Sequence, residues 1–362
     1  MLAAALAIGA AHAKNPERRK GARRPEPTVA AEAGQGAASE PPARPATGVR
    51  RGNMLLRQGY FRMAVAAFEE AVAASPESPE AHLGLGTAKA RLGTCAPALE
   101  EFRGWSDSIA FGARVALLAA HCAGRQSHPE EAVSFTLSAL EKRPDNRTAL
   151  ARLALDADQL GDAVLRDVAI EYLWYASPDQ DESLFAEAAL ALRHGDLAEF
   201  DRYDAMWRRE GRASEEMNRM RARSWLDVGD PVEAYVELRK GGSKLKRGAD
   251  SRLMMSETAR RLGQLVDASR ALHGRLQGKL SGADADAVQA RILVDSGDLE
   301  GAAALLKGYE LEVDEEMVAS RWYLARALGR EEEMAAAEVA FAASRMSPLR
   351  TLEQYIPLTQ RR

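Results

Sequence analysis

Arginines recur along this chain at an interval of 34 residues, and their guanidinium groups are the side chains best suited to do chemistry in it. The places of this register hold Arg57, Arg91, Arg125, Gln159, Arg193, Asp227, Arg261 and Asp295. A guanidinium presents a planar fork of donors that can bind both oxygens of one carboxylate. Arginines repeated in this way could therefore bind acidic or carboxylate-ended peptides. The alternative is that a cation in the last turn of a helix offsets the helix dipole.

Other reactive constellations are missing from the sequence. His121, Cys122 and His128 lie close together, but no fourth ligand stands at a metal-binding spacing, so packing or surface roles account for them better. The chain contains no G-x-S-x-G or H-E-x-x-H motif, and no carboxylate pair stands apart from helix-surface charges. We therefore expect no enzymatic activity, no metal and no cofactor.

The composition is that of a soluble globular protein. Charged residues make up 28%, hydrophobic residues 46%, and the formal net charge is −4. This balance gives no indication of a nucleic-acid partner. No stable membrane insertion is expected either.

Glycines mark a repeating unit that would position these side chains. A 34-residue register contains Gly59, Gly93, Ser127, Gly161, Gly195, Gly229, Gly263 and Gly297. Seven residues before each of these stands a small residue, namely Gly52, Gly86, Ala120, Ala154, Ala188, Ala222, Ser256 and Ala290. A period of this length is typical of helical repeat arrays, and small residues allow two helices to cross closely. Each glycine can adopt the left-handed conformation that ends the first helix of a pair.

These positions resemble the pattern of the tetratricopeptide repeat (TPR) family. The first unit, Pro45 to Ser78, matches the family at Gly52, Gly59, Ala64, Phe68, Ala71 and Pro76. The resemblance extends roughly to Val313. It implies an all-α fold, a right-handed α-solenoid of about eight to nine helix-turn-helix repeats. Members of the family bind a protein or peptide in the concave groove that their first helices line.

The resemblance also indicates which residues face that groove. They are Asn53, Arg57, Leu83, Arg91, Arg114, Leu117, His121, Arg125, Phe185, Arg193, Arg219, Arg223, Arg260, Arg261 and Arg291. Several of these arginines stand in earlier helical turns, where the helix dipole does not explain them. TPR proteins that bind chaperone tails have Lys and Asn at the fifth and ninth places of their first repeat. This chain has Val49 and Asn53 there, so that clamp is incomplete.

The two cysteines fall on helices that are antiparallel neighbours in the TPR arrangement. Cys95 would begin the second helix of the second unit, and Cys122 would lie near the end of the first helix of the third. A disulfide between them is one interpretation if the protein is exported. The other is that both are separate buried thiols acting as small apolar residues.

Four segments are expected along the chain. Residues 1–13 have the form of a signal peptide, 14–47 form a disordered linker, 48–316 form the repeat array, and 317–362 form a degenerate last repeat with a capping segment. Ala11-His12-Ala13 fits a signal-peptidase site, although no cation precedes it and a basic run follows. An unstructured alanine-rich start is the alternative. A cleaved signal would place the protein in the periplasm or cell envelope, and an uncleaved one in the cytoplasm.

The expected function is that of a non-enzymatic scaffold that holds an unidentified, acidic protein or peptide partner. In the exported case it would be an assembly factor of a bacterial envelope machine such as a pilus, secretion or motility apparatus. The first alternative is a cytoplasmic regulatory or sensor module that binds a signalling peptide. The second is a polysaccharide-handling helper, which would need clustered carboxylates and exposed aromatic side chains.

Overall fold

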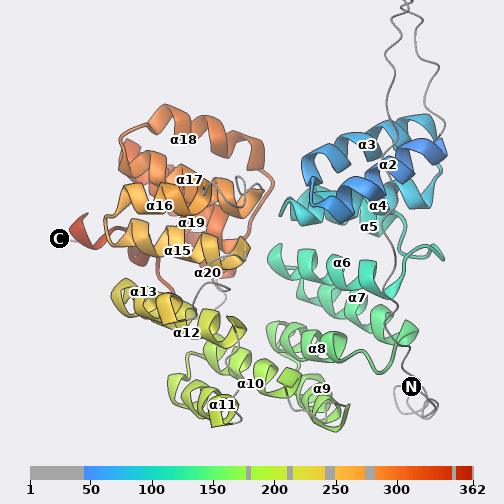
Figure 1. Ribbon diagram of the computed structural model, residues 1–362, viewed down its shortest axis with the longest axis horizontal. Helices are drawn as coiled ribbons and strands as arrows, with labels where there is room; N and C mark the ends of the chain where they lie inside the picture. Colours follow the sequence, from blue (N-terminus) through green and yellow to red (C-terminus); the bar gives the residue numbers. More distant parts are fainter. Residues whose placement is uncertain are drawn as a thin grey trace, which may run out of the picture.

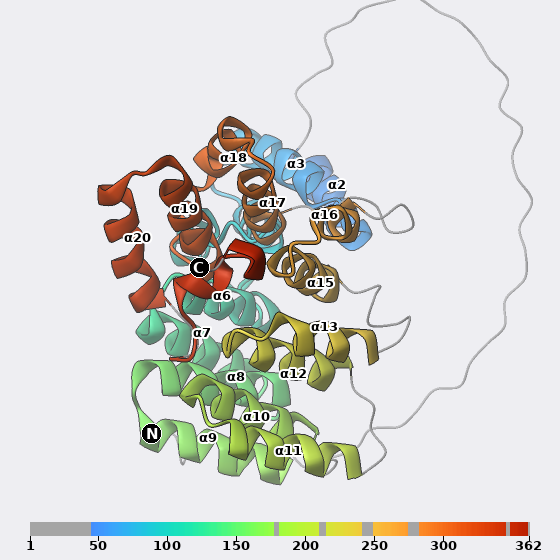
Figure 2. The ribbon, with the colours of Figure 1, turned by 90° about the vertical axis from the view of Figure 1, so that its left-hand side faces the viewer.

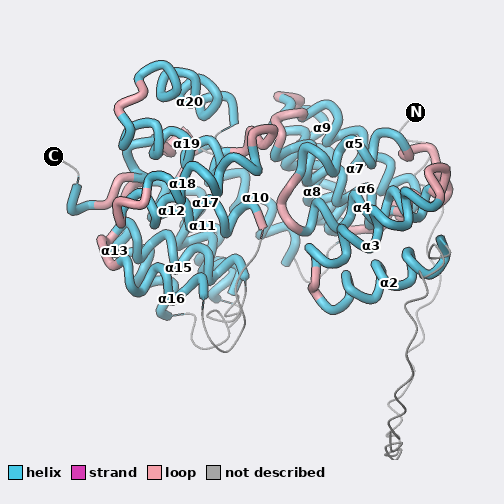
Figure 3. Tube along the Cα trace, turned by 90° about the horizontal axis from the view of Figure 1, so that it is seen from above, coloured by secondary structure: helices cyan, strands magenta, loops and turns pink. Residues whose placement is uncertain are grey.

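The structure is a computed structural model that describes residues 45–176, 181–209, 215–240, 249–273, 282–344 and 348–360. Within these ranges the chain folds into helices and loops without a strand, as Figure 3 shows. The predicted signal peptide and nearly all of the predicted linker lie outside the described residues. The first helix in the described residues begins at Pro45, two residues before the predicted end of the linker.

Eighteen α-helices in the described ranges form nine consecutive antiparallel pairs, which confirms the predicted fold class (Figure 1). The first three pairs are α2 (Pro45–Gln58) with α3 (Phe61–Ala74), α4 (Pro79–Arg91) with α5 (Cys95–Gly104), and α6 (Ala113–Arg125) with α7 (Pro129–Lys142). The next three are α8 (Arg147–Leu160) with α9 (Ala163–Ala176), α10 (Asp181–His194) with α11 (Leu197–Arg209), and α12 (Glu215–Asp227) with α13 (Pro231–Lys240). The last three are α15 (Ala249–Arg261) with α16 (Leu265–His273), α17 (Ala283–Asp295) with α18 (Leu299–Leu306), and α19 (Glu315–Leu328) with α20 (Glu331–Ser344).

The turn within each pair adopts one backbone conformation. All seven glycines of the register, and Gly329 in the ninth pair, have φ between 68° and 86°. Ser127, which replaces glycine in the third pair, has φ 59°. A left-handed residue ends the first helix and lets the second fold back against it. The glycines of the 34-residue register therefore mark the turn between the two helices of their pairs.

Small residues allow the paired helices to pack around buried aromatic rings. Phe68 and Phe102 are fully buried, as are Ala64 and Ala98. A Cβ atom placed on Gly84 would lie 2.2 Å from the Phe68 ring, so this glycine allows the ring to enter the core. The core is consequently a series of clusters, one following another along the array.

The array curves until its first repeats meet its last ones. The Ala283 N–H donates to the Leu92 carbonyl at 2.7 Å, and Arg62 pairs with Asp286 at 3.2 Å. Figure 1 and Figure 2 show α17 and α18 at the same height of the molecule as α2 and α3. We call this contact the seam. Its two sides are Arg62, Leu92, Gly93, Ala96, Arg125 and Gln126, and Gly282, Ala283, Asp284, Asp286, Glu312, Val313 and Asp314.

The C-terminal segment packs on the last pair and also reaches α12. It contains the 3-10 turns η2 (Leu352–Tyr355) and η3 (Leu358–Gln360), and Leu352, Tyr355 and Ile356 join Phe341 in one core cluster. Gln354 donates to the Asp227 carbonyl at 2.8 Å. The predicted boundary between residues 316 and 317 falls inside α19. This helix forms a regular antiparallel pair with α20. Among the described helices, none has the length and apolar character needed to cross a bilayer.

Candidate functional site

A pocket of about 430 Å³ opens on the inner face of the first three pairs. Its walls come mainly from α2, α4 and α6, the first helices of these pairs. Five of the predicted groove residues line it, namely Asn53, Arg57, Leu83, Arg91 and Arg114. We call Arg57, Arg91 and Arg114 the open patch.

The open patch is unpaired and lies beside apolar surface. All three side chains are exposed, and within the described chain none of them has a hydrogen-bonding or ion-pairing partner. Leu83 is buried at the base, and half-buried side chains of Leu56, Thr87, Val115 and Leu118 complete the wall. Glu80 is the one acidic residue among those that line the pocket. The surface can therefore take carboxylates together with apolar side chains.

Two further predicted residues follow on α6. Leu117 packs against the core cluster of the second and third pairs and does not line the pocket. His121 has exposed surface, yet desolvation by the surrounding protein, reinforced by Arg152 and Arg125, lowers its pKa to about 4. Its imidazole is consequently neutral near pH 7, and it adds no cation to the patch.

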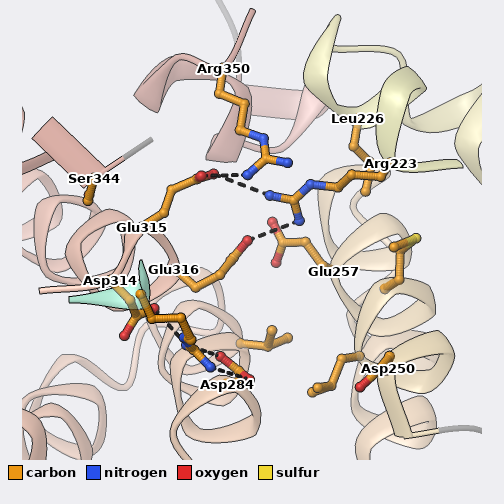
Figure 4. Close-up of a pocket in the computed structure, with 14 residues that line it drawn as sticks. Arg223, Leu226, Asp250, Glu257, Asp284, Asp314, Glu315, Glu316, Ser344 and Arg350 are labelled. Carbon is orange, nitrogen blue, oxygen red and sulfur yellow. Dashed lines mark hydrogen bonds and ion pairs between the residues drawn. The ribbon is translucent and has the colours of Figure 1, made fainter. Parts of the chain in front are cut away.

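The predicted arginines of the later repeats are bound within the protein. Arg223 pairs with Asp227 at 3.1 Å, Glu315 at 3.2 Å and Glu316 at 3.1 Å. Arg260, Arg261 and Arg291 all pair with Glu257, at 2.9, 2.8 and 3.2 Å. We call Arg223, Arg260, Arg261 and Arg291, with these carboxylates, the closed cluster. Figure 4 shows Arg223 pointing toward Glu315 and Glu316, with Glu257 beside it.

Burial of these charges makes their pairing obligatory. Arg260 and Arg291 have no exposed surface. Desolvation opposes ionisation of Glu257, but Arg260, Arg291 and Arg261 together hold its pKa well below its usual value. Arg260 also binds Asp295 at 2.8 Å, and Arg291 binds Glu316 at 2.9 Å. These arginines therefore have no capacity for an external carboxylate in this arrangement.

The C-terminal segment completes the closed cluster. The Tyr355 ring lies 4.5 Å from the Arg261 guanidinium and 5.1 Å from that of Arg291, and its hydroxyl donates to Glu315 at 3.0 Å. Arg350 pairs with Asp227 at 2.7 Å and with Glu315 at 2.5 Å. A cavity of about 290 Å³ remains beside these groups, with both acidic and basic walls (Figure 4). In the described residues, no group of acidic, histidine or cysteine side chains is arranged to hold a metal ion.

The remaining predicted residues lie between these two regions. Arg125 donates to both oxygens of Asp284, at 3.1 and 2.6 Å, and pairs with Asp314 at 2.9 Å, so it belongs to the seam. Arg193 donates to the Leu155 carbonyl, and Arg219 pairs with Asp250 at 3.2 Å. Phe185 packs against the core of the fifth pair.

Cys95 and Cys122 are both free and fully buried in one core cluster. Hydrogen bonding with the Cys122 side chain, together with burial, raises the pKa of the Cys95 thiol. The structure thus brings the two side chains together without a bond between them, and the disulfide stays a prediction.

Several residues of these sites carry no signal in the repeat pattern. Glu312 and Gln126 meet across the seam, and Arg350 and Tyr355 come from the C-terminal segment. Glu257 could have been found, because it stands three and four residues before Arg260 and Arg261 on one helix face, and so could the pairing of Arg223 with Asp227 four residues later.

No protein-family model and no curated protein matches the chain. Among solved structures, it is similar to yeast Tom70 at 14% identity, covering 85% of this chain and 66% of that one, with a TM-score of 0.49. It is similar to a tetratricopeptide repeat protein of Parabacteroides merdae at 13% identity (79% and 99% covered, TM-score 0.37) and to the TPR protein TTC0263 of Thermus thermophilus at 22% identity (45% and 89% covered, TM-score 0.35).

These likenesses concern the fold alone. The assignment rests on features of the described ranges, namely nine antiparallel helix pairs and a left-handed residue at the turn within each pair. Together they make this protein a TPR-like α-solenoid.

Proposed function

We propose that this protein is a non-enzymatic interaction scaffold that binds an acidic segment of a partner protein on the open patch. The observation that carries the proposal is the pocket of the first three pairs, in which three exposed arginines stand around apolar side chains without carboxylate partners in the described chain. Unpaired guanidinium groups beside apolar surface suit a peptide that alternates acidic and apolar residues.

The seam offers an internal example of the same chemistry. Arg125 stands one register step after Arg91 and binds both oxygens of Asp284. Arg57 and Arg91 occupy equivalent positions on their helices, and no carboxylate of the described residues is paired with them. A partner's carboxylates would supply there what Asp284 supplies to Arg125.

The test is charge reversal of the open patch. The triple variant Arg57→Glu, Arg91→Glu, Arg114→Glu should lower affinity for a labelled peptide of alternating Glu and Leu by roughly a hundredfold or more, because attraction becomes repulsion. Fluorescence anisotropy at several salt concentrations measures it. Arg125 is left intact because its reversal would disrupt the seam.

A matched control reverses three exposed arginines elsewhere, Arg143, Arg239 and Arg330. It makes the same change in net charge and should bind the peptide as the unaltered protein does. Equal loss in both variants would show a non-specific charge effect. Unchanged binding in the patch variant would exclude the open patch as the site.

The cellular setting of the scaffold is a narrower proposal that depends on residues 1–13, outside the described residues. With a cleaved signal, we propose a role in assembling a bacterial envelope machine such as a pilus, secretion or motility apparatus. With an intact start, we propose a cytoplasmic regulatory module. Sequencing the N-terminus of the mature protein from cell fractions separates the two, since a chain that begins at Lys14 in the periplasmic fraction supports only the first.

A further inference from the structure

The Cys95–Cys122 pair lies directly beneath the seam. Cys95 is the first residue of α5, and Cys122 lies in the last turn of α6. Neither has any exposed surface, and both belong to one core cluster of the second and third pairs. Two cysteines that share one core cluster can form a disulfide where the local packing brings their sulfur atoms to bonding distance.

Residues next to these cysteines hydrogen-bond to the Glu312 carboxylate, which lies on the other side of the seam. The Ala96 N–H donates to one oxygen of Glu312 at 3.2 Å, and the Gln126 amide donates to the other at 2.5 Å. The Val313 N–H in turn donates to the Gln126 side-chain oxygen at 3.4 Å. Ala96 directly follows Cys95, and Gln126 stands one helical turn after Cys122. We call Ala96 and Gln126 the Glu312 cradle.

We propose that Cys95 and Cys122 form an intramolecular disulfide that fixes the Glu312 cradle and so strengthens the seam. The cradle comes from two separate elements, the start of α5 and the end of α6. A covalent bond between the cysteines would keep the start of α5 and the end of α6 at the spacing they have in the intact seam, even when the other side of the seam moves away. Re-docking of Glu312 would then meet a preformed site, because the bond reduces the freedom of the open state.

The reaction is a thiol–disulfide exchange with a low-molecular-weight disulfide such as oxidised glutathione. One cysteine thiolate attacks the external disulfide and releases one thiol, and the second cysteine then displaces the other. Two S–H bonds break and one S–S bond forms, while the external disulfide takes up both electrons and both protons as two thiols.

Burial sets the pace of this exchange. The hydrogen bond with Cys122, together with burial, raises the pKa of the Cys95 thiol. Since the thiolate is the attacking form, oxidation has to proceed through local opening of the second and third pairs. Oxidation should therefore be slow in the folded protein and faster during folding.

The experiment compares the reduced full-length chain with the chain refolded in oxidised glutathione. Non-reducing digestion and mass spectrometry should yield one cross-linked peptide pair containing Cys95 and Cys122. Hydrogen exchange at the Ala96 and Val313 amides should then slow by about tenfold relative to the reduced protein. Cys122→Ala, which keeps the buried volume similar but has one thiol, should show neither change.

The variant Gln126→Ala distinguishes an effect of the disulfide on the Glu312 cradle from a general stabilisation of the fold. It should still form the disulfide, but oxidation should no longer slow exchange at Val313. Equal slowing in this variant would overturn the cradle mechanism. Cross-links only between chains, glutathione retained on either cysteine, or a disulfide without slower exchange at Ala96 would each overturn the proposal.

Discussion

Arg91 and Arg261 occupy the same place in their repeats, yet one is exposed and unpaired in the described chain and the other is 3% exposed and bound to a carboxylate. The difference begins four residues earlier on each helix, where Thr87 precedes Arg91 and Glu257 precedes Arg261. Glu257 also forms ion pairs with Arg260 and Arg291. The single carboxylate of Glu257 thus allows three arginines to be buried as ion pairs.

This contrast separates two uses of one residue type on one inner face. In the closed cluster the arginines hold α12, α15, α17, α19 and the C-terminal segment together. In the open patch they link no two of the described helices. An arginine paired within the fold contributes to stability and register, whereas an unpaired arginine beside a pocket is available to a partner.

The largest expected effect is at Glu257. Glu257→Gln should lower the free energy of unfolding by about 3–5 kcal/mol, because buried Arg260 and Arg291 would lose their shared counter-charge. Urea denaturation measures it. The matched change in the other region, Arg91→Ala, should stay within about 0.5 kcal/mol of the unaltered protein. Similar losses in both variants would remove the distinction between the two regions.

The seam that joins the regions should weaken as pH rises. Burial, opposed by the Ala96 N–H and reinforced by Asp314, raises the pKa of Glu312 from 4.5 to about 7. Between these values the closed seam keeps a proton that the open or unfolded chain releases, so its stabilising contribution is present below about pH 4.5 and is lost as pH rises to about 7.

Glu312→Gln tests this pH dependence, since the amide cannot ionise. Urea denaturation of both proteins at about pH 5 and about pH 8 should show the unaltered protein losing stability relative to the variant as pH rises. Paired carboxylates elsewhere titrate equally in both, so the difference between the proteins isolates Glu312. A pH-independent difference would show that Glu312 ionises normally in the fold.

The smallest expected effect is at the turn beside the cradle. Ser127→Gly should raise the free energy of unfolding by about 1 kcal/mol, because a side chain in the left-handed region carries a steric cost that glycine avoids. The mirror variant Gly161→Ser, at a turn with open space around its Cβ position, should lower stability by a similar amount. Thermal unfolding of both compares them. A loss in Ser127→Gly would mean that the serine side chain stabilises the third turn.

The repeat pattern predicted the features that depend on residues near one another in the sequence, namely the turns and the helix crossings within each repeat. The glycine register located every turn of the first eight pairs, and the small residue seven places earlier marked where helices cross. Five predicted groove residues line the pocket of the open patch. That they bind a partner stays a prediction, as does the disulfide.

Contacts between distant repeats could not be predicted in this way. Arg223 meets Glu315 and Glu316 more than ninety residues later, and Ala283 meets Leu92 across most of the chain. Such meetings depend on curvature, which is the sum of small rotations between successive repeats and is not encoded at any one position. The sequence therefore indicated the face on which the arginines lie without indicating which of them carboxylates would meet.

The seam also has a mechanical consequence. A solenoid of stacked repeats extends like a spring, and every coil bears the tension applied to its ends. Here the bond between Leu92 and Ala283 ties an early coil to a late one. A pull between Pro45 and Gln360 would pass from α4 through the seam to α17, and helices α8 to α13 would carry little of it until the seam ruptured. The extension of this protein under force should accordingly begin stiff and become compliant in one abrupt step.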